Sequence, residues 1–172
     1  MGDPKEIAEL HGILESLTSR RQWLSELVTE LGFDNSTLRC RGEILDYNLD
    51  PDNILTIYQE TAWCEQEGVR NSIEKKFPSI KVYYRDEEPG CEVYCTNDNG
   101  GDFFPEKFLL DAYEIYEYFH SIGDAIDYIQ DSFDIKVKGQ TYESVRSAID
   151  DYLELHPEVE YMCFHEFHYC ED

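Results

Sequence analysis

Hydrophobic side chains recur at three- and four-residue intervals through the first 33 residues, which predicts helices with one buried face. The pattern is interrupted at residues 18–22, where Ser19 and Gln22 have the spacing of a capping box. Two helices with a bend and one long helix both fit this pattern. Gly32 stands where a C-terminal helix glycine is expected, so the helical segment is predicted to end there. The predicted buried positions are Ile7, Leu10, Leu14, Leu17, Leu24, Leu27, Val28 and Leu31.

Hydrophobic and polar residues alternate through the middle of the chain, which is the period of a β-strand. Strands are predicted at about 38–49 and 54–61, joined by a turn rich in Asp and Asn. A short helix is predicted at about 65–76, where a Phe-Pro pair follows it. Residues 80–95 predict a hairpin with Pro89-Gly90 at its turn.

Helical spacing returns in the last third of the chain. Hydrophobic residues at four- and three-residue steps predict a helical segment over 115–133, which Ser121 could divide by capping a second helix. A short strand is predicted at 135–137 and a further helix at about 145–153, ended by a His-Pro pair. The last strand is predicted at 158–169.

The charge balance narrows the classes of partner. The chain has 172 residues with 38 Asp and Glu against 14 Lys and Arg, for a formal net charge of −24. Nucleic acids and anionic membranes would be repelled by most of this surface, so neither is an expected direct partner. The sequence shows no apolar run of membrane-spanning length and no signal-peptide pattern. Without an export signal, the six cysteines are expected to stay reduced. Cytoplasmic localisation is therefore predicted.

Seven acidic residues fall opposite the hydrophobic stripe of the segment predicted as helix after residue 110. Three- and four-residue spacing separates successive carboxylates by about 4.5–6 Å along a helix axis. This is comparable with the spacing of phosphates along a nucleic-acid strand, so the face could occupy the groove of a nucleic-acid-binding protein. An ordinary solvated helix face is the alternative. The predicted partner-binding residues are Asp111, Glu114, Glu117, Asp124, Asp127, Asp131 and Asp134.

Four candidate metal ligands lie close together near the C-terminus: Cys163, His165, His168 and Cys170. On one strand Cys163 and His165 would share a face and His168 would point the other way, so a bend near Phe167 would be needed. The spacing also differs from that of common zinc sites. No metal is therefore predicted. No other cofactor and no catalytic residue is predicted either, because the chain carries no phosphate-binding loop and no nucleophile motif.

Part of the middle segment resembles the YubB-type ferredoxin-like domain family, whose members are carried by plasmids, phages and conjugative elements. The resemblance covers residues 40–111 and follows the order strand, Thr-Ala-Trp, helix, Phe-Pro, strand, Glu-x-Gly, strand. In that family Ser-Pro usually follows the Trp, whereas Cys64-Glu65 follows it here. The resemblance implies an α/β sandwich and a mobile-element origin, and it brings no catalytic residues. The matching runs are Glu60-Thr61-Ala62-Trp63, Lys76-Phe77-Pro78-Ser79, Tyr83-Tyr84 and Glu87-Glu88-Pro89-Gly90-Cys91.

Together these observations predict one α+β domain over 1–172, with a mostly antiparallel central sheet, packed helices and a ferredoxin-like middle part. Its parts are a helical segment at 1–33, a sheet core at 38–110 and an acidic helical segment with a final strand at 111–172. The predicted function is a non-enzymatic acidic protein that mimics nucleic acid and inhibits a basic, nucleic-acid-binding defence protein such as a restriction or CRISPR effector. A small metal-binding or structural accessory protein is the alternative.

Overall fold

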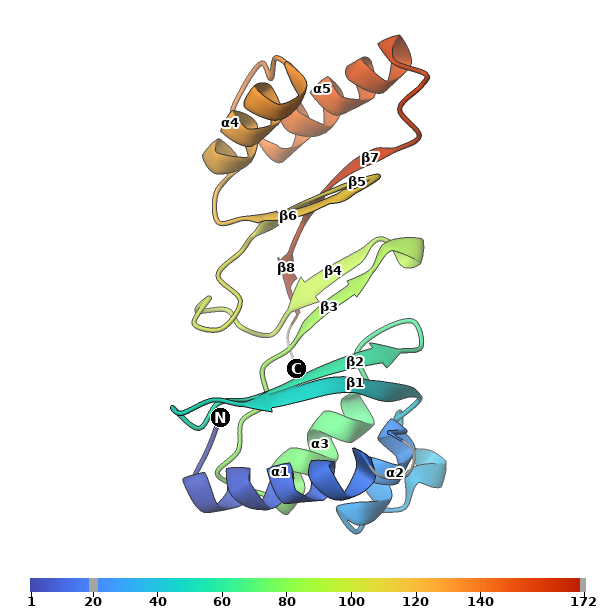
Figure 1. Cartoon of the computed structure of the whole chain (residues 1–172), viewed down its shortest axis with the longest axis vertical. Coiled ribbons are helices and arrows are strands. Elements are labelled where there is room, and N and C mark those ends of the chain that lie inside the picture. Colours follow the sequence, from blue (N-terminus) through green and yellow to red (C-terminus); the bar gives the residue numbers. More distant parts are fainter. Residues whose placement is uncertain (19–21, 171–172) are drawn as a thin grey trace. The chain divides into compact units, whose positions relative to one another are not determined.

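The computed structural model describes residues 1–18 and 22–170 of the chain and confirms the α+β class (Figure 1). The chain divides into two compact units, Met1–Tyr84 and Arg85–Asp172, and each is considered by itself. In place of the single central sheet expected at 38–110, the described residues form three small sheets. Their strands, in spatial order, are β1 (Gly42–Leu49) and β2 (Leu55–Thr61); β3 (Arg85–Glu88), β4 (Val93–Thr96) and β8 (His168–Tyr169); and β6 (Ile115–Phe119), β5 (Phe108–Ala112) and β7 (Met162–Glu166). No described helix has both the length and the apolar character needed to cross a membrane.

In the first unit, three described helices pack on one side of a two-stranded sheet (Figure 1). Helix α1 spans Pro4–Thr18 and α2 spans Leu24–Glu30, so the helical segment is two helices. All eight predicted hydrophobic positions of this segment are buried in one core. Gly32 has a φ of +93° immediately after the second helix, as the sequence predicted for its end. Ser19 of the expected capping box lies outside the described residues, and Trp23 occupies the N-cap of α2 without a side-chain bond.

Strands β1 (Gly42–Leu49) and β2 (Leu55–Thr61) form the predicted antiparallel hairpin, and α3 (Glu67–Lys76) follows it. Ile44 donates its N–H to the carbonyl oxygen of Gln22 at 2.7 Å, and Trp23 bridges Glu43. These bonds attach the start of α2 to β1. Val69 and Ile73 bury the inner face of α3 in the same core, as their spacing predicts.

The second unit has two sheets and two helices. Strands β3 (Arg85–Glu88) and β4 (Val93–Thr96) form a hairpin that turns at Pro89–Cys91, as predicted. The prediction is wrong for residues 80–84, which are irregular, because the first strand of the hairpin begins only at Arg85. Helices α4 (Ile122–Phe133) and α5 (Tyr142–Leu155) lie together on one face of the β6-β5-β7 sheet (Figure 1). Their inner faces share a core with Phe108, Leu110, Met162 and Phe164.

The helical segment predicted over 115–133 is wrong in its first part. Residues Phe108–Ala112 and Ile115–Phe119 are strands β5 and β6, joined by a two-residue turn. Ile115 and Phe119 are four residues apart, and this spacing places two side chains on one face of a strand as well as of a helix. Ser121 does cap α4, because its hydroxyl accepts the N–H of Asp124. The strand predicted at 135–137 is absent, and Ile135 is buried in an irregular connection.

The strand predicted at 158–169 is divided at Phe167. Strand β7 (Met162–Glu166) pairs with β5, and β8 (His168–Tyr169) pairs in parallel with β4. The last strand segment therefore joins both sheets of the second unit.

Candidate functional site

The seven predicted partner-binding acids do not lie along one helix. Asp111 belongs to β5, Glu114 to the following turn and Glu117 to β6, so the expected continuous helical row is wrong for these three. Asp111 is only partly exposed and accepts a hydrogen bond from the Tyr161 hydroxyl at 3.0 Å. Its carboxylate is therefore engaged within the unit. Glu114 and Glu117 are exposed, as the sequence predicted.

The other four predicted acids do share one element. Asp124, Asp127 and Asp131 project from α4 at three- and four-residue spacing, and Asp134 is its C-cap with a φ of +55°. All four are exposed, because Ala125, Ile126 and Ile129 turn the opposite face of the helix to the core. The row from Asp124 to Asp131 covers about 10 Å along the axis.

A second acidic row lies on α5, and the sequence analysis did not identify it. Glu143, Asp150, Asp151 and Glu154 are all exposed, at positions i, i+7, i+8 and i+11 of the helix. This is the spacing of one helix face, and Val145 and Ile149 bury the other. The sequence did contain this information, because the hydrophobic residues of α5 determine which face of the helix is left exposed to solvent. The row covers about 16 Å.

These eight residues form what we call the acidic helix layer: Asp124, Asp127, Asp131, Asp134, Glu143, Asp150, Asp151 and Glu154. Among the described residues, none of the eight forms an ion pair with Lys or Arg. At the first turn of α5, the backbone N–H of Glu143 and the Thr141 hydroxyl lower the pKa of the Glu143 carboxyl, which keeps it ionised. The layer therefore presents uncompensated negative charge.

Charge is divided unequally between the two units. Residues 1–84 contain 15 acidic and 9 basic residues, whereas residues 85–172 contain 23 acidic and 5 basic residues. The second unit therefore carries most of the net negative charge, and the acidic helix layer belongs to it.

On its other face, the β6-β5-β7 sheet contacts the β3-β4-β8 sheet through aromatic and charged side chains. The Tyr116 and Tyr118 hydroxyls donate to the Glu87 carboxylate at 2.7 and 2.9 Å, and Arg85 pairs with Glu87 at 2.9 Å. Burial and the Glu87 charge raise the pKa of Tyr118 to about 12. These tyrosines therefore hold the two sheets together as neutral donors.

Cys163, His165 and His168 near the C-terminus line one pocket of the second unit, but they are not arranged as a metal site. Cys163 and His165 lie on β7, while His168 lies on β8 and Cys170 follows it. Within the described part of the chain, no group of three or more His, Cys, Asp or Glu side chains is placed to hold a metal ion. Burial raises the pKa of the Cys163 thiol and lowers that of the His165 imidazole, so both groups favour their neutral forms.

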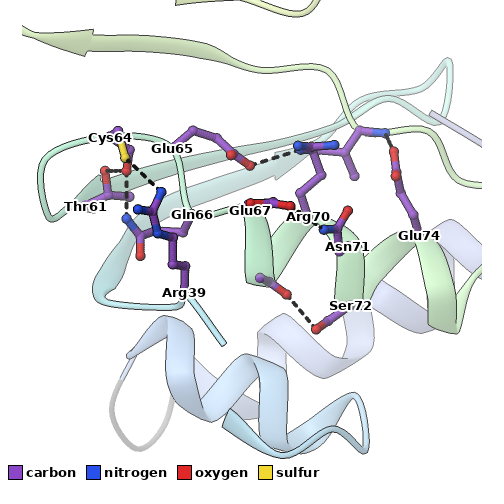
Figure 2. Close-up of polar contacts among 12 residues, drawn as sticks. Arg39, Thr61, Cys64, Glu65, Gln66, Glu67, Arg70, Asn71, Ser72 and Glu74 are labelled. Carbon is purple, nitrogen blue, oxygen red and sulfur yellow. Dashed lines mark hydrogen bonds and ion pairs between the residues drawn. The ribbon is translucent and has the colours of Figure 1, made fainter. Parts of the chain in front are cut away.

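The first unit contains a different feature that the sequence analysis did not identify. A pocket of about 520 Å³ is lined by Trp23, Leu38, Arg39, Arg41, Trp63 and Cys64, with smaller residues between them. We call it the arginine–tryptophan pocket. Figure 2 shows the polar contacts that hold part of its wall, including the Arg39 guanidinium 4.0 Å from the Cys64 sulfur. Sequence alone did not reveal it because its walls come from segments that are distant along the chain.

Comparison with protein-family models, with curated proteins and with solved structures finds no match to this chain in any of the three.

Proposed function

We propose that the chain is a non-enzymatic acidic binding protein that occupies the nucleic-acid-binding surface of a basic partner protein. The acidic helix layer of the second unit is the proposed contact surface. The partner is a protein and not a nucleic acid or a membrane, because both of those are polyanions and would be repelled by a chain of net charge −24.

The observation that carries this proposal is that eight exposed carboxylates on α4 and α5 have no cationic partner among the described residues. A domain of this size needs a net charge of only about 2–8 for solubility. Charge beyond that level costs folding free energy through self-repulsion. A basic groove that binds the layer would neutralise this repulsion. Binding such a groove would therefore explain why the chain carries more negative charge than solubility needs.

The arrangement of the layer supports a groove rather than a flat surface as the counterpart. The carboxylates form two rows on neighbouring helices, about 10 and 16 Å long, and packed helix axes typically lie about 8–10 Å apart. Two roughly linear rows of negative charge are also what a nucleic-acid duplex presents to its binding proteins. Lys136 and Lys138 are exposed in the connection between α4 and α5, and Arg146 is exposed on α5. We therefore propose that the layer mimics the charge density of a nucleic acid and not its detailed shape.

The resemblance of residues 40–111 to the YubB-type family adds a biological setting. We propose a restriction or CRISPR effector as the target class, because this resemblance implies a mobile-element origin. These effectors bind DNA or RNA through basic channels, which would match the acidic helix layer in charge.

The proposal is tested by capturing proteins from a bacterial lysate with the tagged chain, purifying the captured protein and measuring competition with its own DNA or RNA. The test variant neutralises four residues of the layer: Asp127→Asn, Asp131→Asn, Asp151→Asn and Glu154→Gln. A control variant of equal charge change neutralises four exposed acids of the first unit: Glu9→Gln, Glu43→Gln, Asp52→Asn and Glu60→Gln.

The proposal predicts that the partner binds either the chain or its nucleic acid but not both, and that the layer variant loses most of this competition. The control variant should keep it. Simultaneous binding of both ligands would contradict the proposal. Equal losses in the two variants would show that total charge matters and that the acidic helix layer does not.

A further inference from the structure

The arginine–tryptophan pocket of the first unit differs in charge from the rest of the chain. Among the described residues, its only charged lining residues are Arg39 and Arg41, and no described carboxylate lines it. Among the described residues neither guanidinium forms an ion pair, whereas Arg70 pairs with Glu65 at 3.1 Å and Arg85 pairs with Glu87 and Glu106. Two unpaired arginines in one pocket of an otherwise acidic chain indicate an anionic ligand.

The same pocket contains both tryptophans of the chain. Trp23 is 45% exposed and Trp63 is 69% exposed, although an indole ring is among the side chains that gain most from burial. Exposed indole rings beside a cavity provide flat surfaces on which a planar ligand can stack. The ligand is therefore expected to combine a planar ring with negative charge.

The wall of the pocket is held in place by one buried side chain. Gln66 is 4% exposed; its Oε1 accepts the Arg41 N–H at 2.8 Å, and its Nε2 donates to the carbonyl oxygens of Cys64 and Ala62 at 2.7 and 3.2 Å. These bonds connect the segment that carries both arginines to the loop that carries Trp63. Figure 2 shows Gln66 beside Cys64 in this loop. The pocket is thus formed before a ligand arrives, which lowers the entropic cost of binding.

The backbone of Trp63 is also unusual. Its φ is +74°, which lies in the left-handed region that bulky side chains rarely adopt. The neighbouring bonds hold this conformation, because the Thr61 hydroxyl donates to the Cys64 carbonyl oxygen at 3.0 Å across the loop. Strained conformations of this kind occur most often at binding sites. Trp63, which has this conformation, also has the more exposed of the two indole rings.

We propose that the arginine–tryptophan pocket binds a nucleotide, with the base stacked on an indole ring and the phosphate held by Arg39 and Arg41. A pocket of about 520 Å³ lies within the size range of small-ligand sites, and a mononucleotide supplies both the planar ring and the charge. The inference is independent of the proposed function, because the pocket lies wholly in the first unit and the acidic helix layer lies in the second.

The first test titrates the full chain with AMP, GMP, CMP and UMP and follows tryptophan emission and calorimetric heat. Because both tryptophans line the pocket, saturable quenching of their emission is expected with at least one nucleotide. The matching nucleoside lacks the phosphate, and ribose 5-phosphate lacks the base. Each of these half-ligands should bind roughly tenfold more weakly or worse, because each loses one of the two contacts.

The second test compares variants by calorimetry. Arg39→Gln with Arg41→Gln should weaken the nucleotide roughly tenfold or more and leave the nucleoside unchanged, whereas Trp63→Leu should weaken both ligands. The control Lys5→Gln with Lys76→Gln has the same charge change at exposed positions away from the pocket and should bind like the unmodified chain. Circular dichroism melting establishes that each variant is folded.

Three results would overturn the inference. The first is that none of the four nucleotides binds at millimolar concentration. The second is that the arginine variant and the lysine control lose affinity equally, which would assign the effect to net charge. The third is that the chain self-associates in sedimentation and that Trp63→Leu abolishes the association, which would make the pocket an interface between copies.

Discussion

Replacing Gln66 with alanine is expected to destabilise the first unit by about 2–4 kcal/mol, because buried hydrogen bonds are lost. The side chain is buried and makes three hydrogen bonds to backbone groups of two segments. A neutral intramolecular hydrogen bond contributes about 0.5–1.5 kcal/mol net, and a buried group left without its partner costs more. The Cys64 carbonyl oxygen keeps its bond from the Thr61 hydroxyl, so the loss should fall below the upper limit for three orphaned groups.

The assay is urea denaturation followed by tryptophan emission. Both tryptophans lie in residues 1–84, so their emission reports the first unit, while far-ultraviolet circular dichroism reports both units. The variant Gln66→Met keeps the volume of the side chain and removes its polar atoms, which separates packing from hydrogen bonding. We expect the methionine variant to recover little of the loss. A change below about 0.5 kcal/mol in the alanine variant would contradict the argument, because it is the size of an ordinary surface substitution.

Three further predictions concern other parts of the chain. Trp63→Gly should leave the first unit as stable or stabilise it by about 1 kcal/mol in urea denaturation, because glycine adopts a φ of +74° without strain. Burial raises the pKa of Asp98, but backbone N–H groups that include those of Phe103 and Phe104, at 2.7 and 2.9 Å, bring it below its ordinary value. Ionised Asp98 therefore stabilises the folded state above about pH 4, and this stabilisation is lost as the pH falls through the folded-state pKa. In circular dichroism melting, Asp98→Asn should be less stable than the unmodified chain by about 1.5–3 kcal/mol at pH 7, and its stability should depend less on acid. Raising monovalent salt from about 0.02 to 0.2 M should raise the melting temperature by screening carboxylate repulsion, and a flat or falling melting temperature would contradict it.

The buried faces of the helices were predictable from sequence where the helical period was unambiguous. The stripe from Ile7 to Leu31 is buried throughout, and Ser121 caps α4 as its position indicated. The error at residues 111–119 has a specific cause. Ile115 and Phe119 fit both periods, and only their pairing with Ala112 and Phe108 decides between helix and strand. Strand pairing depends on contacts across a turn, and the spacing of hydrophobic residues along the sequence does not reveal these contacts.

The candidate sites were predictable to different degrees. The acids of α4 were identified because the hydrophobic stripe fixed their face, and the same reasoning applied to α5 would have found Asp150 and Glu154. The arginine–tryptophan pocket depends on Gln66 bonding to Arg41, 25 positions away in sequence. No local pattern encodes that contact, so the pocket becomes visible only in three dimensions.

The measurement that tests the central claim most directly is the association rate of the captured partner with the unmodified chain, the helix-layer variant and the first-unit control. If the acidic helix layer steers a basic groove, the layer variant should associate roughly tenfold more slowly at about 0.05 M salt, and the difference should shrink at about 0.3 M salt. The control variant should stay close to the unmodified chain at both salt concentrations. A layer variant that associates as fast as the control would contradict the proposed role of this surface.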